Sequence, residues 1–289
     1  MATGGTAAQQ DGDGDGRTVQ IADGRRHFPL RLRFKPSNKG IGFFITKRLA
    51  NEGITTILAA RNEKNGLEAV EKLHAEGLNN VEFHCCDLLN HETIDDLARW
   101  LKEKYGGIDI LVNNAGFAYH GNVFGPEEAK VTIDTNYHGT KAVTERLLPL
   151  LRPSSKGMPQ IAKIMQSAGK EMPLPDHESG QDSGQISGLI KPIRKGVHSE
   201  EGWPNSMYGV SKIVELAYTR ILAKELASRP EGQKVIVTVC CPGYCATDMS
   251  SWKGYKSADD GADTPVWLAL TPPSDAHGEF YYERRKRSY

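Results

Sequence analysis

Short apolar runs alternate with longer amphipathic stretches from about residue 40 onward, and this alternation constrains the fold more than any other feature. The apolar runs have the length of strands, and the stretches between them are long enough for several helical turns. Strands that are each followed by a helix form βαβ units, which place the strands in a parallel sheet. The predicted fold class is therefore α/β, with a single Rossmann-type doubly wound parallel sheet and helices on both faces. The expected strands are 54–60, 81–86, 108–113, 161–165 and 235–241, and the expected helices are 43–51, 63–76, 92–104, 130–151 and 208–228.

Three segments fall outside this alternation. Residues 1–27 are mainly Gly, Asp, Gln, Ala and Thr, and such a segment buries too little apolar surface to offset the entropy of ordering it. We expect this leader to be disordered and residues 28–289 to form one dinucleotide-binding domain. Residues 170–205 are rich in Pro and Gly and follow an expected strand, so this insertion is interpreted as a substrate lid. The basic run within 283–287 is expected to be a solvated tail.

Charge balance and cysteine spacing exclude several classes of protein. The chain has 36 basic and 36 acidic residues, so its formal net charge of zero gives no general attraction to nucleic acid or to an anionic membrane. No apolar run is long enough to span a bilayer, and the N-terminus lacks the apolar core of a secretory signal. The five cysteines have the spacing of neither a zinc site nor a disulfide framework. We therefore expect a cytoplasmic protein with free thiols and without a bound metal.

The first candidate cofactor site is at the start of the first expected helix. The run Asn38-Lys39-Gly40-Ile41-Gly42 places two glycines where backbone N–H groups can approach a pyrophosphate, whose charge the helix N-terminus favours. Arg61 follows the next expected strand, and a cation at this point suits the 2′-phosphate of NADP better than the ribose hydroxyl of NAD. Lys39 and Arg61 together predict NADP, while an ordinary solvated loop residue remains the alternative for Arg61.

Three more segments at strand ends extend the expected cofactor site. A carboxylate after strand 81–86 can accept the adenine amino group, and small residues with amides after strand 108–113 let a cofactor lie against the sheet edge. A Pro-Gly turn with a Thr beyond strand 235–241 can hold the nicotinamide carboxamide, although an ordinary turn is the alternative. The residues concerned are Asp87, Leu88, Asn114, Ala115, Gly116, Pro242, Gly243 and Thr247.

The candidate catalytic pair is Tyr208 and Lys212, which stand four residues apart and therefore share one helix face. The unperturbed pKa of a phenol is about 10, and a neighbouring ammonium favours the phenolate. Lys212 can also reach a ribose hydroxyl. Tyr208 would then act as the general acid toward a carbonyl oxygen while a nicotinamide supplies hydride.

Together these motifs resemble the short-chain dehydrogenase/reductase family, in particular its monomeric carbonyl-reductase branch, which includes plant reductases of terpenoid or alkaloid ketones. The resemblance implies an NADP-dependent reductase of a small-molecule ketone or aldehyde, active as a monomer. In that family an Asn on a helix and a Ser after a strand join the Tyr and Lys in catalysis. Asn136 matches the family's Asn, and Ser167 is the candidate serine.

Two departures from the family pattern leave a second interpretation open. Pro36 stands where the family has the first Gly of its glycine-rich turn, and Pro lacks the N–H. Residues 28–34 are a candidate first strand ahead of it. Gln166 falls at the position of the family's catalytic serine, and Ser167 comes one residue later. The alternative is a catalytically impaired, non-enzymatic relative that at most binds nucleotide.

Overall fold

Strands and helices alternate along the chain in the computed structural model, which describes residues 19–21, 30–33, 40–114, 116–119, 126–152, 160–164, 206–230 and 233–288. The strands are β1 (Val19–Ile21), β2 (Leu30–Arg33), β3 (Thr55–Ala60), β4 (Val81–Cys85), β5 (Ile110–Asn113), β6 (Gln160–Ile164), β7 (Ile236–Cys241), β8 (Phe280–Tyr282) and β9 (Arg285–Arg287). The α-helices are α1 (Ile41–Asn51), α2 (Glu63–Ala75), α3 (His91–Tyr105), α4 (Pro126–Ile133), α5 (Thr140–Leu147), α7 (Met207–Ala227), α8 (Ala258–Gly261) and α9 (Asp263–Leu270). The shorter helical turns are η1 (Asp134–Gly139), η2 (Leu148–Leu150) and η3 (Asp248–Ser250).

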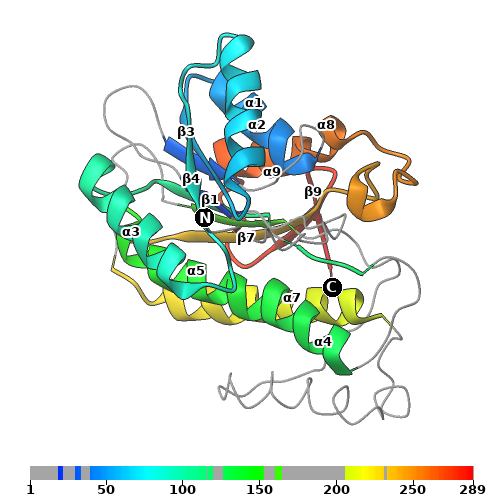
Figure 1. Ribbon diagram of the computed structural model, residues 1–289. Coiled ribbons are helices and arrows are strands. Elements are labelled where there is room, and N and C mark those ends of the chain that lie inside the picture. The colour runs from blue at the N-terminus through cyan, green and yellow to red at the C-terminus, as the bar shows by residue number, and fades with distance from the viewer. Residues whose placement is uncertain are drawn as a thin grey trace, which may run out of the picture.

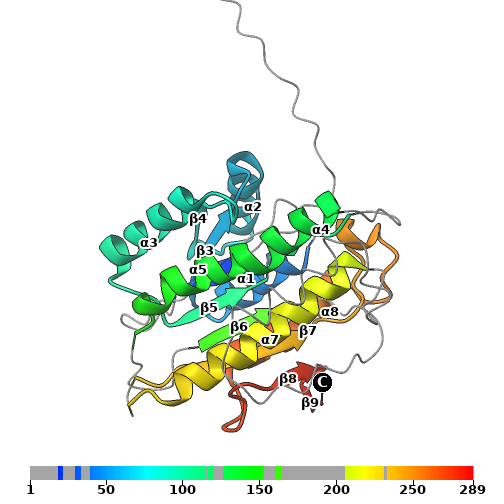
Figure 2. The same cartoon turned by 90° about the horizontal axis from the view of Figure 1, so that it is seen from below.

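The strands lie between two layers of helices, as the α/β alternation predicts (Figures 1 and 2). One layer contains α1, α2, α8 and α9, and the other contains α3, α4, α5 and α7. Strands β5, β6, β7 and β8 are parallel neighbours, and β2, β3 and β4 form a second parallel set. The predicted Rossmann-type α/β fold class is confirmed, although the strands hydrogen-bond in a six-stranded and a three-stranded sheet rather than in the single sheet expected. In the part of the chain that the structure describes, no helix has the length and apolarity of a membrane span.

The ends of the six-stranded sheet differ from the all-parallel expectation. At one end β1 pairs antiparallel with β5, so residues 19–21 are ordered although disorder was expected through residue 27. The other residues of that leader lie outside the described ranges. The candidate strand 28–34 is present as β2, which runs parallel to β3. Each added strand gives backbone partners to an edge that would otherwise be unpaired.

At the other end, residues 285–287 form β9 rather than the expected solvated tail. They pair antiparallel with β8 through a two-residue turn at Glu283 and Arg284. Both turn residues have positive φ, 51° and 58°, which is the backbone of a type I′ hairpin turn. Such a turn follows the twist of the two strands, and this explains why a basic segment continues the sheet.

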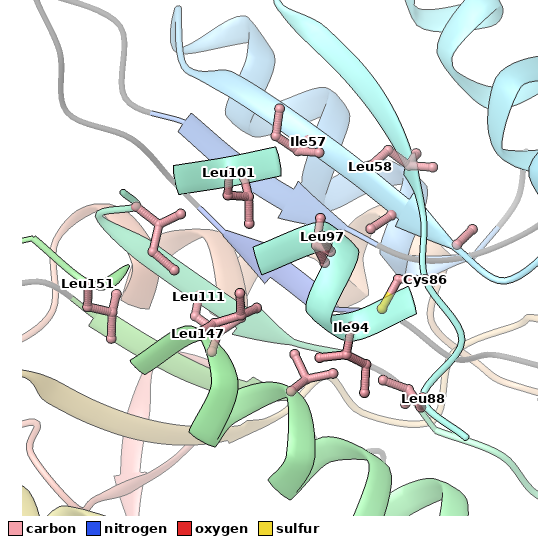
Figure 3. Packing of buried hydrophobic residues seen from close by; sticks show 14 of the residues in the cluster. Ile57, Leu58, Cys86, Leu88, Ile94, Leu97, Leu101, Leu111, Leu147 and Leu151 are labelled. Atoms are coloured by element: carbon pink, nitrogen blue, oxygen red, sulfur yellow. The ribbon is translucent and has the colours of Figure 1, made fainter. Parts of the chain in front are cut away.

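The hydrophobic core occupies both faces of the sheet. Figure 3 shows one cluster in which Leu97 and Leu101 of α3 and Leu147 of α5 pack toward Leu111 of β5. On the opposite face, α1 contributes to a second cluster with α8 and α9. Strands β5 and β7 are buried at every position, as expected for strands covered on both sides.

A π-helical segment interrupts the helix that was expected over 130–151. α4 passes into the π turn η1, and α5 and the 3₁₀ turn η2 follow. The wider turn brings Gly139 against the loop after β4, where a Cβ on residue 139 would lie 2.7 Å from Leu88 Cβ and 3.0 Å from its carbonyl oxygen. Glycine therefore allows η1 and this loop to approach closely.

We predict that Gly139→Ala destabilises the protein by about 1–3 kcal/mol, because a side chain there must displace backbone as well as Leu88. The measurement is chemical denaturation followed by circular dichroism. Glu145→Ala, on the exposed face of α5, is the control and should change stability by less than about 0.5 kcal/mol. Equal stability of Gly139→Ala and the wild type would contradict the close approach.

Candidate active site

The start of α7 brings Tyr208 and Lys212 together. Ser206 caps the helix by accepting a hydrogen bond from the Gly209 N–H at 3.1 Å. Tyr208 is half-buried in the first turn, and Lys212 is buried one turn later. Lys212 Nζ lies 5.1 Å from the centroid of the Tyr208 ring. The structure thus places an ammonium directly beside the candidate phenol.

Asn136 joins three parts of the chain at this point. It is fully buried in η1, where its Nδ2 donates to Phe117 O at 2.9 Å and to Ser211 Oγ at 2.8 Å. Its Oδ1 accepts from the Phe117 N–H at 2.7 Å. Ser211 Oγ in turn donates to Tyr208 O at 2.8 Å. The amide therefore ties the segment after β5 to the first turn of α7.

Ser211 and Phe117 were not expected from the sequence. Ser211 lies inside the Tyr-Gly-Val-Ser-Lys run, but its partner Asn136 is 75 residues away. Phe117 contributes only backbone groups to the contact, and a backbone contact leaves no pattern of residue types. Only the position of Ser211, one residue before Lys212, offered a signal.

Gly116 leaves room for the lysine amine. A Cβ on this residue would lie 3.2 Å from Lys212 Nζ and 3.7 Å from Met249 Cε. Asn114 beside it is half-buried, and Asn113 donates through Nδ2 to Thr144 Oγ1 at 2.9 Å. The Asn-Asn-Ala-Gly string thus brings the end of β5 close to the ammonium.

Glu215 is a third residue that sequence reasoning missed. Both of its carboxylate oxygens accept from Lys212 Nζ, at 3.0 and 3.1 Å, and both side chains are almost inaccessible to solvent. The signal was present in the sequence. An acid between Val214 and Leu216 interrupts the apolar face of a helix that is otherwise buried there.

The first turn of α1 has the features expected for an anion site. Gly40 occupies the N-cap position with extended backbone and forms no side-chain capping bond, and Gly40 and Gly42 are both buried. The first N–H groups of a helix have no partner within the helix, so they are suited to a phosphate oxygen.

The residues expected at the ends of β3 and β4 differ in how well they suit a cofactor. Arg61 is exposed directly after β3. Asp87 is half-buried, and its Oδ1 accepts from the Leu89 N–H at 3.0 Å, which shapes the turn. Leu88 belongs to the core cluster of Figure 3 and its side chain packs against η1, so its expected role at the cofactor site stays a prediction.

The turn after β7 is fixed by its own hydrogen bonds. Gly243 has φ of +86°, which favours glycine, and a Cβ there would lie 3.0 Å from Lys256 Cδ. Thr247 is buried and donates through its backbone N–H to Ser250 Oγ at 3.0 Å. Pro242 and Gly243 are buried as well, so this segment packs closely at the end of β7.

Several expected site residues lie outside the described ranges, so the structure places none of them. They are Asn38, Lys39, Ala115, Ser167 and the lid segment 170–205.

Three buried thiols, those of Cys86, Cys240 and Cys245, are poorly suited to nucleophilic chemistry. Burial raises the pKa of the Cys86 thiol to about 12 and that of Cys245 to about 11, and it raises the pKa of Cys240 well above its usual value. These groups stay protonated near neutral pH, and only the thiolate is a good nucleophile.

We predict that Asn136→Ala destabilises the protein by about 1–3 kcal/mol for each Phe117 backbone group left without a partner. Thermal unfolding of the purified variant measures this. Thr135→Val is the matched control, because the Thr135 hydroxyl is buried without a hydrogen-bond partner among the described residues. The control should keep or raise the wild-type stability. A similar loss in both variants would contradict the role assigned to Asn136.

Comparison with known proteins identifies relatives along most of the chain. A family profile described as short chain dehydrogenase matches residues 37–176. Carbonyl reductase (NADPH) 1 of Mus musculus is 40% identical over 262 residues, which cover 86% of this chain and 94% of that protein. The Homo sapiens protein of the same name is 38% identical over 265 residues, with the same shares covered.

Solved structures agree with this relationship. Salutaridine reductase from Papaver somniferum has a TM-score of 0.74 at 31% identity, with 85% of this chain and 97% of that one covered. Menthone neomenthol reductase from Mentha piperita has a TM-score of 0.68 at 31% identity, with 85% and 95% covered. Since the similarity to both sets of proteins extends over nearly their whole lengths, the chain belongs to the short-chain dehydrogenase family.

Proposed function

We propose that this protein is an NADP-dependent oxidoreductase that reduces the carbonyl group of a small ketone or aldehyde to an alcohol. The observation that carries the proposal is the Lys212 ammonium held 5.1 Å from the centroid of the Tyr208 ring, at the start of a buried helix. The names of the mouse and human relatives, carbonyl reductase (NADPH) 1, support the same reaction and cofactor.

Tyr208 is the proton donor in this proposal. Its phenol gives a proton to the carbonyl oxygen of the substrate, and the Lys212 ammonium stabilises the phenolate that remains. Asn136 keeps Tyr208 in place through Ser211, because the two hydrogen bonds fix the first turn of α7 against η1. Bound NADPH would supply the hydride that completes the reduction.

The described residues fit a dinucleotide. The uncapped first turn of α1 at Gly40, Ile41 and Gly42 suits the pyrophosphate, and the missing Cβ of Gly116 leaves space beside Lys212. Lys212 would hold a ribose hydroxyl with a donor that Glu215 leaves free. The remaining proposed contacts come from Asn38, Lys39, Arg61, Asp87, Asn114, Ala115, Pro242, Gly243 and Thr247.

Further parts of the proposal come from the family resemblance. Ser167 would orient the carbonyl group, residues 170–205 would cover the substrate, and the protein would act as a cytoplasmic monomer. No two of the five cysteines, all of which lie within the described ranges, are joined in a disulfide, which suits a reducing compartment. Size-exclusion chromatography with light scattering tests the monomer.

We predict that Tyr208→Phe lowers kcat for ketone reduction by about 10²–10⁴-fold, because the phenol is the proton donor. The loss of NADPH absorbance with a panel of ketones measures the rate. Tyr218→Phe is the control on the same helix, since its ring packs on Tyr137 at 5.9 Å and should keep activity. Turnover that survives Tyr208→Phe would reject the mechanism. A wild-type protein that neither binds nor oxidises NADPH would reject the function.

We predict that Arg61→Ala raises KM for NADPH by about 10–100-fold and leaves KM for NADH nearly unchanged, because a charge-assisted bond to the 2′-phosphate is lost. Steady-state kinetics with both cofactors measure the effect. Lys64→Ala removes another exposed cation three residues further on and serves as the control. Equal effects on the KM values for NADPH and NADH would show that Arg61 does not bind the 2′-phosphate.

A further inference from the structure

The interior of α7 holds an acid that the proposed reaction does not use. Glu215 is 1% exposed, and its two carboxylate oxygens lie 3.0 and 3.1 Å from Lys212 Nζ. Its neighbours Val214 and Leu216 are buried apolar residues. Removing a carboxylate from water is strongly unfavourable, and an apolar side chain of similar volume often stabilises such a position better. Packing alone therefore does not explain this acid.

The surroundings of Lys212 Nζ indicate what the carboxylate does. An ammonium has three donors, and Lys212 Nζ donates to both carboxylate oxygens of Glu215. The Tyr208 ring lies 5.1 Å away, and the backbone of Gly116 comes so close that an added Cβ would be 3.2 Å from Nζ. The ammonium is thus held between a carboxylate and a phenol ring, with backbone alongside.

We propose that Glu215 is a positioning residue that acts on Tyr208 through Lys212, a role whose catalytic consequence rests on the proposed function. The carboxylate keeps the ammonium beside the phenol and offsets part of its positive charge. An isolated ammonium would favour the phenolate strongly, and a phenolate has no proton to give to a carbonyl oxygen. Glu215 thereby widens the pH range in which Tyr208 acts as an acid.

Other titratable groups lie on the elements packed against α7, which are α4, η1 and β7, and on the segment 242–250 after β7, whose Met249 approaches Gly116 together with Lys212. Those at least partly buried are Glu128, Asp134, Tyr137, Cys240, Cys241, Cys245 and Asp248. All of them are unchanged in the variants that follow, so a difference from the wild type reports the charge at residue 215.

The test compares Glu215→Gln, which removes the charge and keeps the shape, with Glu225→Gln. The second variant makes the same change at an exposed position of the same helix. Loss of a nearby negative charge favours the phenolate. As the pH rises, ketone reduction by Glu215→Gln should therefore decline at a lower pH than ketone reduction by the wild type. The alkaline limb of its kcat/KM profile should move down by about one pH unit. Glu225→Gln should follow the wild type, and a Glu215→Gln profile that does so too would overturn the proposal.

A second readout needs neither cofactor nor turnover. The ultraviolet absorbance of the Tyr208 phenolate is obtained as the difference between each protein and its Tyr208→Phe counterpart, and it is followed against pH. The midpoint should be lower in Glu215→Gln than in the wild type. If this shift occurs in a protein that does not oxidise NADPH, the proposed function fails and the electrostatic role of Glu215 stands. Equal midpoints would reject that role whatever the activity.

Glu215→Asp keeps the proposal testable if Glu215→Gln does not fold because Lys212 is left as an unpaired buried charge. The shorter acid keeps the charge and draws the ammonium away from the ring. The alkaline limb should therefore not move to lower pH, as it does in Glu215→Gln, while kcat falls several-fold. An unchanged kcat in Glu215→Asp would contradict the positioning role.

Discussion

The side-chain amide of Asn136 is the contact on which the geometry of the site depends. An amide offers two donors and one acceptor oxygen, and here it binds both backbone groups of Phe117 and the hydroxyl of Ser211. Together with Asn136 itself these partners come from three separate segments, and the bond between Asn136 and Ser211 is fully buried. The π turn that carries Asn136 is held in turn by the close approach of Gly139 to Leu88. Strand ends and helix starts thus meet around one buried side chain.

Much of the fold could be predicted from the sequence because its signals are local. Apolar runs such as that of β7 and amphipathic stretches such as that of α3 show their periodicity within a few residues, and the expected elements agree with the observed ones to within a few residues. β1 could not be predicted, because a three-residue strand is too short for a pattern and forms by pairing with a distant edge. The π turn could not be predicted either, since it inserts a residue into a helix without changing the residue types.

The residues of the candidate site, like the elements of the fold, could be predicted where their sequence signals are local. The spacing of Tyr208 and Lys212 was sufficient to place both on one face of a helix, and Gly116 was identified from a short string after a strand. The position of Leu88 after a strand did not reveal that its side chain turns toward the core. Glu215 was missed because an acid in an apolar run has meaning only once its partner is known.

The hairpin at the C-terminal end has a consequence for how molecules of this protein meet. β9 is the outermost strand of its sheet, and its three residues, Arg285, Lys286 and Arg287, are all exposed cations. The free backbone groups of such a strand would otherwise be a template for the strand of another molecule. If two copies approached each other through β9, the cations of the two edge strands would face each other. Their repulsion protects this edge of the sheet from aggregation.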